Sequence, residues 1–212
     1  EAPLQRESSS SQGFQLLQFS ARSKSALDAM AARMALYLRN EPGTNLADVA
    51  HTLHCGRKQF DHRLAVVAAT TYEAAEILAA TENMWRTQHS VDAHGANLVW
   101  LFSGQGAQYA GMGKELFVSD SDFRAAMDDA LSAVQPHVSF DMREAVFESD
   151  SARLANTEVT QPALFCLQYA LMRMWQAKRV APVCLIGHSV GEFAAAVLAD
   201  IMSLADAAKL VA

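Results

Sequence analysis

Several features that the sequence lacks restrict its function. It has only three cysteines, Cys55, Cys166 and Cys184, which are odd in number and far apart. That pattern argues against a disulfide framework or a metal site, and it predicts reduced thiols in a cytoplasmic protein. The net charge is −6 and there is no basic run, so nucleic acid is not an expected partner. No stretch approaches the roughly 18 apolar residues of a membrane span, and the polar, serine-rich beginning is no signal peptide.

What is present is the composition of an ordinary globular protein, with 51% hydrophobic and 19% charged residues among 212. The alternation of apolar strands with amphipathic helices predicts an α/β fold. We expect a flexible tail over 1–13, a small α/β linker domain over 14–95, and a parallel-sheet domain over 96–212. The chain lacks an initiator Met and stops inside a helical pattern that has a start at Ser203 but no stop signal. A piece of a longer polypeptide is therefore expected.

The first region predicts a small layer of two or three strands with helices on one side. Its third helix should open with the capping box Thr70-x-x-Glu73. The polar stretch 81–96 predicts a connection between the two regions. The other expected elements are a strand over 14–19, a helix capped by Ser23, a short helix from Leu46 that ends near Gly56, and a strand over 64–69.

The second region predicts a parallel sheet covered by helices on both faces. Two apolar runs, 98–102 and 183–186, are expected to be buried strands. A long helix is expected to begin with Pro162 at its first position and to end at Lys178. Its apolar residues occur nearly all round, which predicts a central, buried helix. Shorter helices are expected around 113–117, 122–134, 141–147 and 192–199.

A serine flanked by glycines follows the second of these strands. The strand 183–186 leads into Gly187-His188-Ser189-Val190-Gly191, and a helical run comes next. This is the G-x-S-x-G pattern of a nucleophile elbow, in which a sharp strand-to-helix turn exposes a serine hydroxyl. The turn also directs the backbone N–H of Val190 toward an oxyanion at the positive end of the new helix. The pattern therefore predicts that Ser189 is a catalytic nucleophile.

A second glycine turn, Gly104-Gln105-Gly106, follows the other buried strand. Loops at the carboxyl edge of a parallel sheet face ligands, and the N–H of Gln105 is a candidate for a second oxyanion donor. The turn lacks the Lys-Ser/Thr of a phosphate loop and the spacing of a dinucleotide fingerprint, which argues against nucleotide binding. Alone such a turn is more often structural, but its pairing with the elbow favours a role in catalysis.

Together these motifs resemble the malonyl-CoA:acyl carrier protein acyltransferase family, and more closely the acyltransferase domains of modular type I polyketide synthases. The sequence departs from the family at Ser103, where proline is usual. Part of the first region is similar to the linker that joins a ketosynthase to its acyltransferase. The segments that carry the resemblance are 101–113, 160–163 and 187–192 for the acyltransferase, and 17–23, 47–53 and 62–67 for the linker.

The resemblance implies that Ser189 accepts the acyl group and that the amides of Gln105 and Val190 form the oxyanion hole. Malonyl-CoA would be the substrate and the phosphopantetheine thiol of an acyl carrier protein the acceptor, with no bound cofactor. A ketosynthase domain of the same polypeptide would be the other partner. Valine after the nucleophile favours malonyl over methylmalonyl. His188 is expected to shape the pocket, and Met112 to line the acyl pocket or to pack.

The sequence has no histidine after Ser189 to act as its base. The resemblance implies that the base histidine, and an arginine that pairs with the malonyl carboxylate, lie beyond residue 212. Upstream, His51 and His54 lie near Cys55, but their number and spacing do not suit zinc. We therefore expect no metal site.

Two other functions remain open from the residues alone. An α/β-hydrolase esterase or thioesterase would use the same serine but transfer the acyl group to water. A catalytically silent fragment would serve as structural support or as a docking surface for a carrier protein. The acceptor of the acyl group, and the residues that follow Ala212, discriminate among these functions.

Overall fold

The computed structural model divides into two compact units, Glu1–Ala96 and Asn97–Ala212. Within the described residues, no helix combines the length and the apolar character that a membrane span requires. The tail expected over 1–13 lies outside the described residues except for Gly13. The structure describes residues 13–80, 82–90 and 97–212.

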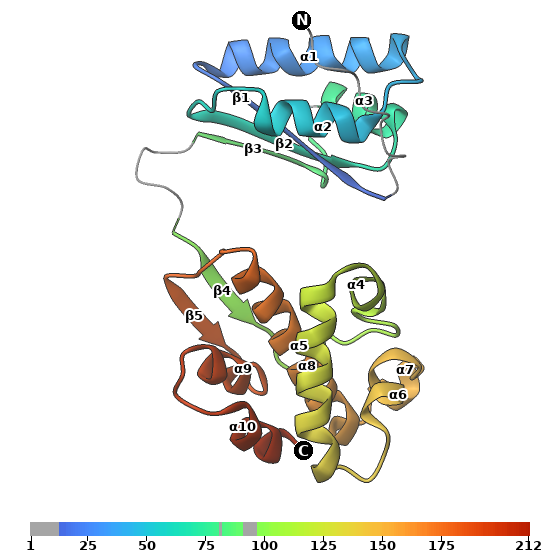
Figure 1. The fold of residues 1–212 in the computed structure, drawn as a ribbon, viewed down its shortest axis with the longest axis vertical. Coiled ribbons are helices and arrows are strands. Elements are labelled where there is room, and N and C mark those ends of the chain that lie inside the picture. The colour runs from blue at the N-terminus through green and yellow to red at the C-terminus, as the bar shows by residue number, and fades with distance from the viewer. Residues whose placement is uncertain (1–12, 81, 91–96) are drawn as a thin grey trace, which may run out of the picture. The chain divides into compact units, whose positions relative to one another are not determined.

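The first unit is an antiparallel sheet with helices packed on it (Figure 1). The strands lie in the order β1-β2-β3, with Leu17 opposite Val66 and Phe19 opposite Leu64. These four side chains are buried and belong to the same core as Leu27 and other helical residues, so the helices cover one face, as predicted. The elements are β1 (Gln15–Ala21), α1 (Lys24–Asn40), α2 (Leu46–Cys55), β2 (His62–Ala68), α3 (Thr71–Ala79) and β3 (Arg86–Ser90).

The helices of this unit begin where their capping residues predict. Ser23 accepts a hydrogen bond from the N–H of Ala26 at the start of α1. At the start of α3, the Thr70 hydroxyl accepts from the N–H of Glu73, and the Glu73 carboxylate accepts from the N–H of Thr70. The predicted capping box is confirmed.

Strand β3 corrects the prediction of a connection over 81–96. Its five residues carry mostly polar side chains and show no alternation of apolar residues. The strand forms because its backbone pairs with β2, from Arg86 opposite Val66 to Ser90 opposite His62. Backbone hydrogen bonds of this kind have no signature in side-chain hydrophobicity, which explains why the pattern missed them.

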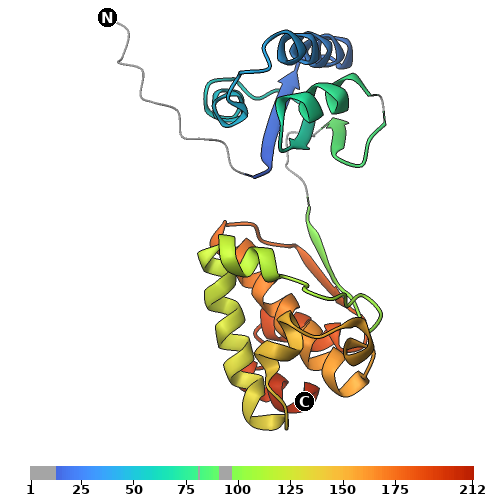
Figure 2. The same ribbon diagram turned by 90° about the vertical axis from the view of Figure 1, so that its right-hand side faces the viewer.

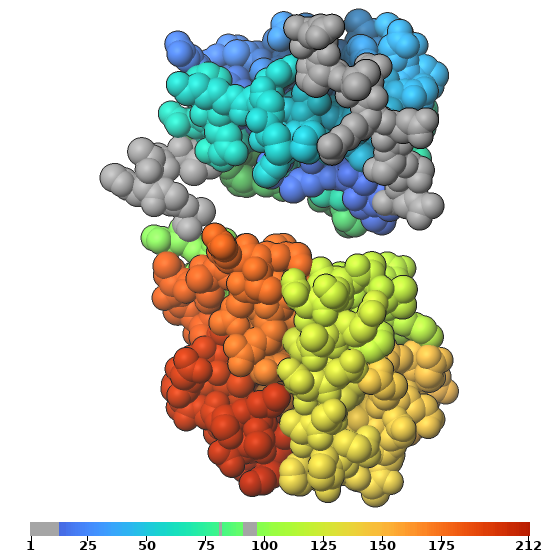
Figure 3. Space-filling model, viewed as in Figure 1, coloured from blue at the N-terminus to red at the C-terminus, as the bar shows by residue number. Residues whose placement is uncertain are grey.

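The second unit is built around α8 (Thr157–Ala177). In Figures 1 and 2 this helix, in orange, lies beside the yellow-green α5 (Ser121–Val134), and it also contacts α9 and α10. Phe165 and Ala163 on α8 are completely buried, whereas Trp175 is 46% exposed. The space-filling view shows the helices closely packed against one another (Figure 3). The remaining helices are α4 (Lys114–Ser119), η1 (Gln135–His137), α6 (Met142–Phe147), α7 (Ser151–Leu154), α9 (Gly191–Leu198) and α10 (Leu204–Val211).

Helix α8 begins earlier than the sequence predicts. Asn156 caps it by accepting from the N–H of Glu158, so Pro162 lies inside the helix and not at its first position. A proline in the second turn removes one backbone hydrogen bond. The Asn156 cap and the burial of the residues around it outweigh this loss.

The two strands of this unit, β4 (Val99–Phe102) and β5 (Cys184–Gly187), are parallel neighbours. Phe102 is buried, but Leu101 is 74% and Ile186 is 52% exposed. Within the described residues, helices therefore cover one face of this sheet, and the predicted cover on its second face is not present in this stretch of chain. A continuous apolar run does not tell which of its residues will be covered.

Candidate active site

Ser189 occupies a left-handed backbone conformation, with φ 54°, between β5 and α9. The other described non-glycine residues with positive φ are Arg179 and Asp200, which follow the ends of α8 and α9. That conformation is ordinary after a helix, but Ser189 precedes one. It costs about 1–2 kcal/mol for an L-residue, so the surrounding contacts must hold it. The result is an exposed serine on a strand-to-helix turn.

The glycines on either side make this turn possible through close backbone contacts. A Cβ on Gly191 would lie 2.4 Å from the carbonyl oxygen of Phe102, at the end of β4. A Cβ on Gly187 would lie 2.5 Å from the Cα of Glu192. Both distances are shorter than any real Cβ contact, so neither position accepts a side chain without movement of backbone. The elbow is thus packed directly onto the end of the neighbouring strand.

The second glycine turn lies against the elbow. The N–H of His188 donates to the carbonyl of Phe102 at 3.0 Å, which joins the ends of β4 and β5. A Cβ on Gly104 would lie 2.5 Å from Nδ1 of His188. Gly106 donates its N–H to Oε1 of Gln108 at 2.7 Å, which closes the turn. The structure therefore brings together two loops that are more than 80 positions apart in the sequence.

Two backbone N–H groups on these loops are free to bind a ligand. Among the described residues, neither the N–H of Gln105 nor that of Val190 donates to another group. Val190 is the residue that precedes α9, at the positive end of the helix, and its side chain is only 2% exposed. Unpaired N–H groups on a turn that carries an exposed serine, and on the loop against it, are suited to binding negative charge on oxygen.

The two predicted pocket residues differ in environment. The imidazole of His188 lies over Gly104, between the two loops. Met112 is completely buried in the core of the second unit. Of the two roles that the sequence allows for it, lining the acyl pocket or packing, this burial agrees with packing. A role for either side chain in a substrate pocket stays a prediction.

Helix α8 holds the second loop through two side chains that the sequence analysis missed. Nε2 of Gln168 donates to the carbonyl oxygen of Ser103 at 2.7 Å and to its Oγ at 3.2 Å. Nε2 of Gln105 donates to Oγ1 of Thr157 at 3.1 Å. The one sequence signal for Gln168 is a polar residue within an apolar stretch of the long helix α8.

Among the described residues, no side chain hydrogen-bonds to Ser189 Oγ. The histidines of α2 are engaged elsewhere: Nδ1 of His54 lies 2.7 Å from Oε1 of Gln18, and Nδ1 of His51 lies 3.9 Å from Sγ of Cys55. The described parts of the chain contain no group of three or more residues placed to hold a metal ion.

Two titratable groups of the second unit have shifted pKa values that bear on reactivity and stability. Burial raises the pKa of the Cys166 thiol to about 12, so this cysteine is a packing residue and not a nucleophile. Asp120 accepts hydrogen bonds from Nζ of Lys178 and from the N–H of Phe123, and these hold the pKa of its carboxyl below the usual value.

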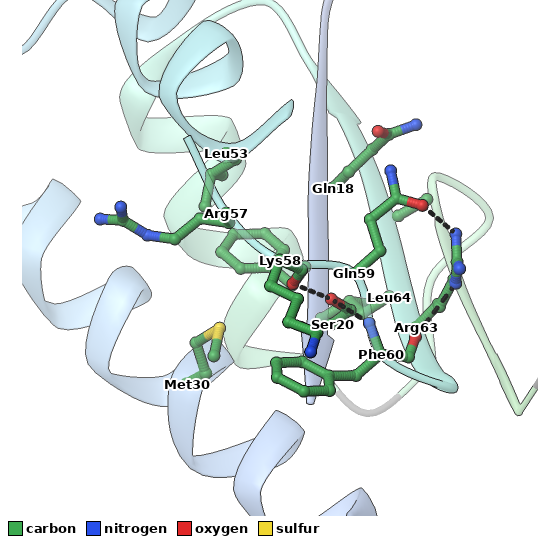
Figure 4. A pocket seen from close by; sticks show the side chains of 12 residues that line it. Gln18, Ser20, Met30, Leu53, Arg57, Lys58, Gln59, Phe60, Arg63 and Leu64 are labelled. Carbon is green, nitrogen blue, oxygen red and sulfur yellow. Dashed lines mark hydrogen bonds between the residues drawn. The ribbon is translucent and has the colours of Figure 1, made fainter. Parts of the chain in front are cut away.

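A cavity of about 230 Å³ lies in the first unit, away from the serine in sequence (Figure 4). Figure 4 shows Met30 and Leu53 on one side of it and Phe60 on another. The cations of Arg22 and Lys58 lie over the Phe60 ring, at 5.4 and 5.8 Å from its centroid. The cavity contains no serine paired with a base, and it offers no alternative to the elbow as a catalytic site.

Comparison with known proteins identifies the family. Residues 99–212 match the family described as "Acyl transferase domain", which is more than half of the chain. The chain belongs to this acyltransferase family. Residues 15–78 match the family described as "CurL-like, PKS C-terminal". The resemblance to the acyltransferase region of modular type I polyketide synthases is confirmed, together with the α/β fold.

Curated relatives are polyketide synthases of much greater length. The chain is 37% identical to the pikromycin polyketide synthase component PikAII of Streptomyces venezuelae over 196 residues, which is 91% of this chain and 5% of that protein. It is 39% identical over 220 residues to the erythronolide synthase EryA2 of Saccharopolyspora erythraea, which covers 100% of this chain and 6% of that protein. The chain thus spans a small part of these relatives.

Solved structures of polyketide acyltransferase domains share the fold. The acyl transferase domain of ZmaA superposes with a TM-score of 0.83 at 36% identity, covering 96% of this chain and 48% of that one. The acyl transferase domain of SpnD, in a complex with 2-(pent-4-yn-1-yl)malonyl, gives 0.82 at 34% identity, with 96% and 48% coverage. The chain therefore spans about half the length of these structures.

Proposed function

We propose that the chain carries the nucleophile and the oxyanion hole of an acyltransferase that loads a malonyl-type unit in polyketide biosynthesis. Ser189 would accept the acyl group from acyl-CoA and pass it to the phosphopantetheine thiol of an acyl carrier protein. The observation that supports this most strongly is the exposed Ser189 at positive φ, on an elbow against which the turn 104–106 lies. The reaction needs no resident cofactor or metal, because CoA and phosphopantetheine arrive as substrates.

In the loading half of the reaction, Ser189 Oγ attacks the thioester carbonyl carbon and its proton passes to a base. The N–H groups of Gln105 and Val190 donate to the tetrahedral oxyanion, and removal of one such donor typically lowers kcat by about 10²–10³-fold. The C–S bond then breaks, and the leaving CoA thiolate takes the proton from the base. The base is proposed to be a histidine that follows residue 212, as the family resemblance implies.

In the transfer half, the pantetheine thiol gives its proton to the same base and attacks the acyl-serine ester. The new C–S bond forms, the C–O bond breaks, and Ser189 Oγ takes the proton back. The enzyme therefore alternates between a free and an acylated form, which is ping-pong kinetics.

The substrate and partners are inferred from the relatives and from Val190. The solved SpnD domain holds a malonyl derivative, and valine after the nucleophile favours malonyl itself. The relatives are long multidomain synthases, which supports an acyl carrier protein and a ketosynthase in the same polypeptide as partners. We place the reaction in the cytoplasm on the basis of cysteine usage.

The test is a denaturing mass spectrum of the full-length polypeptide that carries this sequence, after brief incubation with malonyl-CoA. We expect one malonyl group on the Ser189 peptide. It should be absent in Ser189→Ala and present in Ser119→Ala, a matched change at an exposed serine of the same unit. Added phosphopantetheinylated carrier protein should remove the group and become acylated.

Two outcomes would overturn the proposal in favour of the alternatives. Loss of the malonyl group to water at the same rate with and without carrier protein indicates an esterase or thioesterase. No adduct on a folded full-length polypeptide indicates a silent segment with a structural or docking role.

A further inference from the structure

The loop 103–106 is attached to a single helix at two points. Nε2 of Gln168 donates to the carbonyl oxygen of Ser103 at 2.7 Å, and Nε2 of Gln105 donates to Oγ1 of Thr157 at 3.1 Å. Positions 157 and 168 are about three helical turns apart and lie within roughly 20° of the same face of α8. One face of α8 therefore holds both the beginning of the loop and the side chain of its central residue.

Gln168 is a buried amide whose presence does not favour stability. It is 8% exposed and lies between the buried residues Phe165 and Tyr169 on α8. Its Oε1 is buried and accepts no hydrogen bond from any described group. A buried acceptor without a donor destabilises the folded state, whereas an apolar side chain of the same size would not. What the amide does achieve is the pair of hydrogen bonds from Nε2 to Ser103.

The carbonyl of Ser103 is in a position to control the direction of the Gln105 N–H. It lies so close to the elbow that a Cβ on Gly191 would be 2.8 Å from its oxygen. The next residue, Gly104, is buried against His188 and has no side chain to anchor it. Serine at 103 does not restrict its own φ as a proline would. A hydrogen bond that fixes this carbonyl therefore limits the rotation of the following peptide groups.

We propose that Gln168 and Thr157 are positioning residues that aim the Gln105 N–H at the oxyanion on the acyl carbon. Gln168 holds the backbone before the donor, and Thr157 holds the side chain of the donor residue itself. The inference rests on the acyltransferase function proposed above. Neither residue is proposed to contact the substrate.

The main test compares Gln168→Met with Gln176→Met in the full-length polypeptide. Gln176 is an exposed glutamine on the same helix. We expect Gln168→Met to slow single-turnover acylation by malonyl-CoA about tenfold or more, which is less than complete loss of a donor. The half-saturating malonyl-CoA concentration should stay the same, and the unfolding temperature should be unchanged or higher. Gln176→Met should leave all three quantities at their wild-type values.

Gln168→Glu adds a readout that a packing role would not move. A protonated carboxyl donates an O–H to the Ser103 carbonyl, whereas an ionised one only accepts. Burial raises the pKa of a carboxyl at this position. The acylation rate relative to wild type should therefore be highest at low pH and fall as pH rises through that raised pKa. The corresponding ratio for Gln168→Met should not depend on pH.

The outcomes separate this inference from the function on which it rests. If the wild type is acylated and Gln168→Met reacts at the same rate, the positioning role is overturned and the proposed function stands. If the wild type is not acylated, the proposed function fails, and hydrogen exchange of the loop amides decides the attachment. Faster hydrogen exchange of the amides of 103–106 in Gln168→Met supports the attachment of this loop by Gln168, and unchanged exchange overturns it. Thr157→Val should slow acylation a few-fold, and a wild-type rate would remove Thr157 from the proposal.

Discussion

The two units are both α/β, but they differ in how closely their backbone segments approach one another. In the first unit, a Cβ on Gly43 would have no atom within 4 Å, and one on Gly56 would lie 2.8 Å from the carbonyl oxygen of Thr52, one turn back in the same helix. In the second, a Cβ on Gly187 or Gly191 would lie within 2.5 Å of backbone atoms. The contact of Gly191 with Phe102 differs from that of Gly56, because it joins residues that are distant in the sequence. It lies at the turn that carries Ser189.

Buried polar side chains follow the same division. Among the described residues, the buried polar or charged ones are Ser149, Thr160 and Gln168, and all three belong to the second unit. The first unit has a core of apolar side chains on one face of an antiparallel sheet. Packing explains that core, although Nε of Arg86 in β3 is buried without a hydrogen-bond partner. The core of the second unit itself contains a polar group, the Gln168 amide, that packing does not explain.

The largest effect is expected from adding one carbon to the elbow. Gly191→Ala places a Cβ 2.4 Å from the carbonyl oxygen of Phe102, so the turn must shift. A displacement of about 1 Å in a catalytic geometry can lower the rate about 10²-fold, and we expect at least that loss in acylation of Ser189. Gly43→Ala, the control in the first unit, should change the free energy of unfolding by less than about 0.5 kcal/mol. Equal rates for Gly191→Ala and wild type would contradict the importance of this contact.

A smaller effect is expected from opening a cavity in each core in turn. Leu27→Ala in the first unit and Leu164→Ala in the second should each lower the free energy of unfolding by about 2–5 kcal/mol. Because the two residues belong to separate buried clusters, Leu27→Ala should speed hydrogen exchange in the first unit and leave acylation unchanged. Leu164→Ala should affect the second unit and slow acylation. An equal loss of acylation in both variants would show that the units depend on each other.

The smallest effect concerns two helix caps, one charged and one neutral. Asp120 caps α5 and accepts a hydrogen bond from Lys178, and both interactions lower the pKa of its carboxyl. The ionised carboxylate therefore adds to the free energy of unfolding above the usual carboxyl pKa of 3.8. This stabilisation is lost as pH falls through the lowered pKa. Asp120→Ala should cost about 1 kcal/mol at neutral pH, and less in acid. Ser23→Ala removes an uncharged cap from α1, so its cost, also about 1 kcal/mol, should not change with pH. Chemical denaturation of the wild type and both variants at several pH values measures the loss of free energy of unfolding in each variant. If that loss depends on pH equally in the two variants, the role of charge at Asp120 is contradicted.

The elements that sequence patterns predict well are those with local causes. The capping box Thr70-x-x-Glu73 and the cap at Ser23 join residues three positions apart, and both are present. The strand-turn-helix order around Ser189 was likewise predicted from a short motif, and the turn has the positive φ of an elbow. The beginning of α8 was predicted wrongly because a proline signal was preferred to the asparagine cap that precedes it.

The elements that were missed depend on partners far away in the chain. Strand β3 exists through its pairing with β2 and has no hydrophobic pattern of its own. Within the described residues, the covered face of the β4–β5 pair is the one that carries Phe102, and the helices that pack on it decide this. No window of neighbouring residues contains that information.

By itself, the sequence determined the α/β fold, the nucleophile motif and the helix caps at Ser23, Thr70 and Ser203, because these features are carried by residues a few positions apart. The tertiary structure alone decided what surrounds Ser189. It placed β4 and β5 side by side, brought Gly191 against Phe102, and joined Gln168 to Ser103 across 65 positions of sequence. Such contacts form only when whole helices and strands pack against one another. The residues that make them are distant in the sequence, so no local sequence pattern indicates that they will meet.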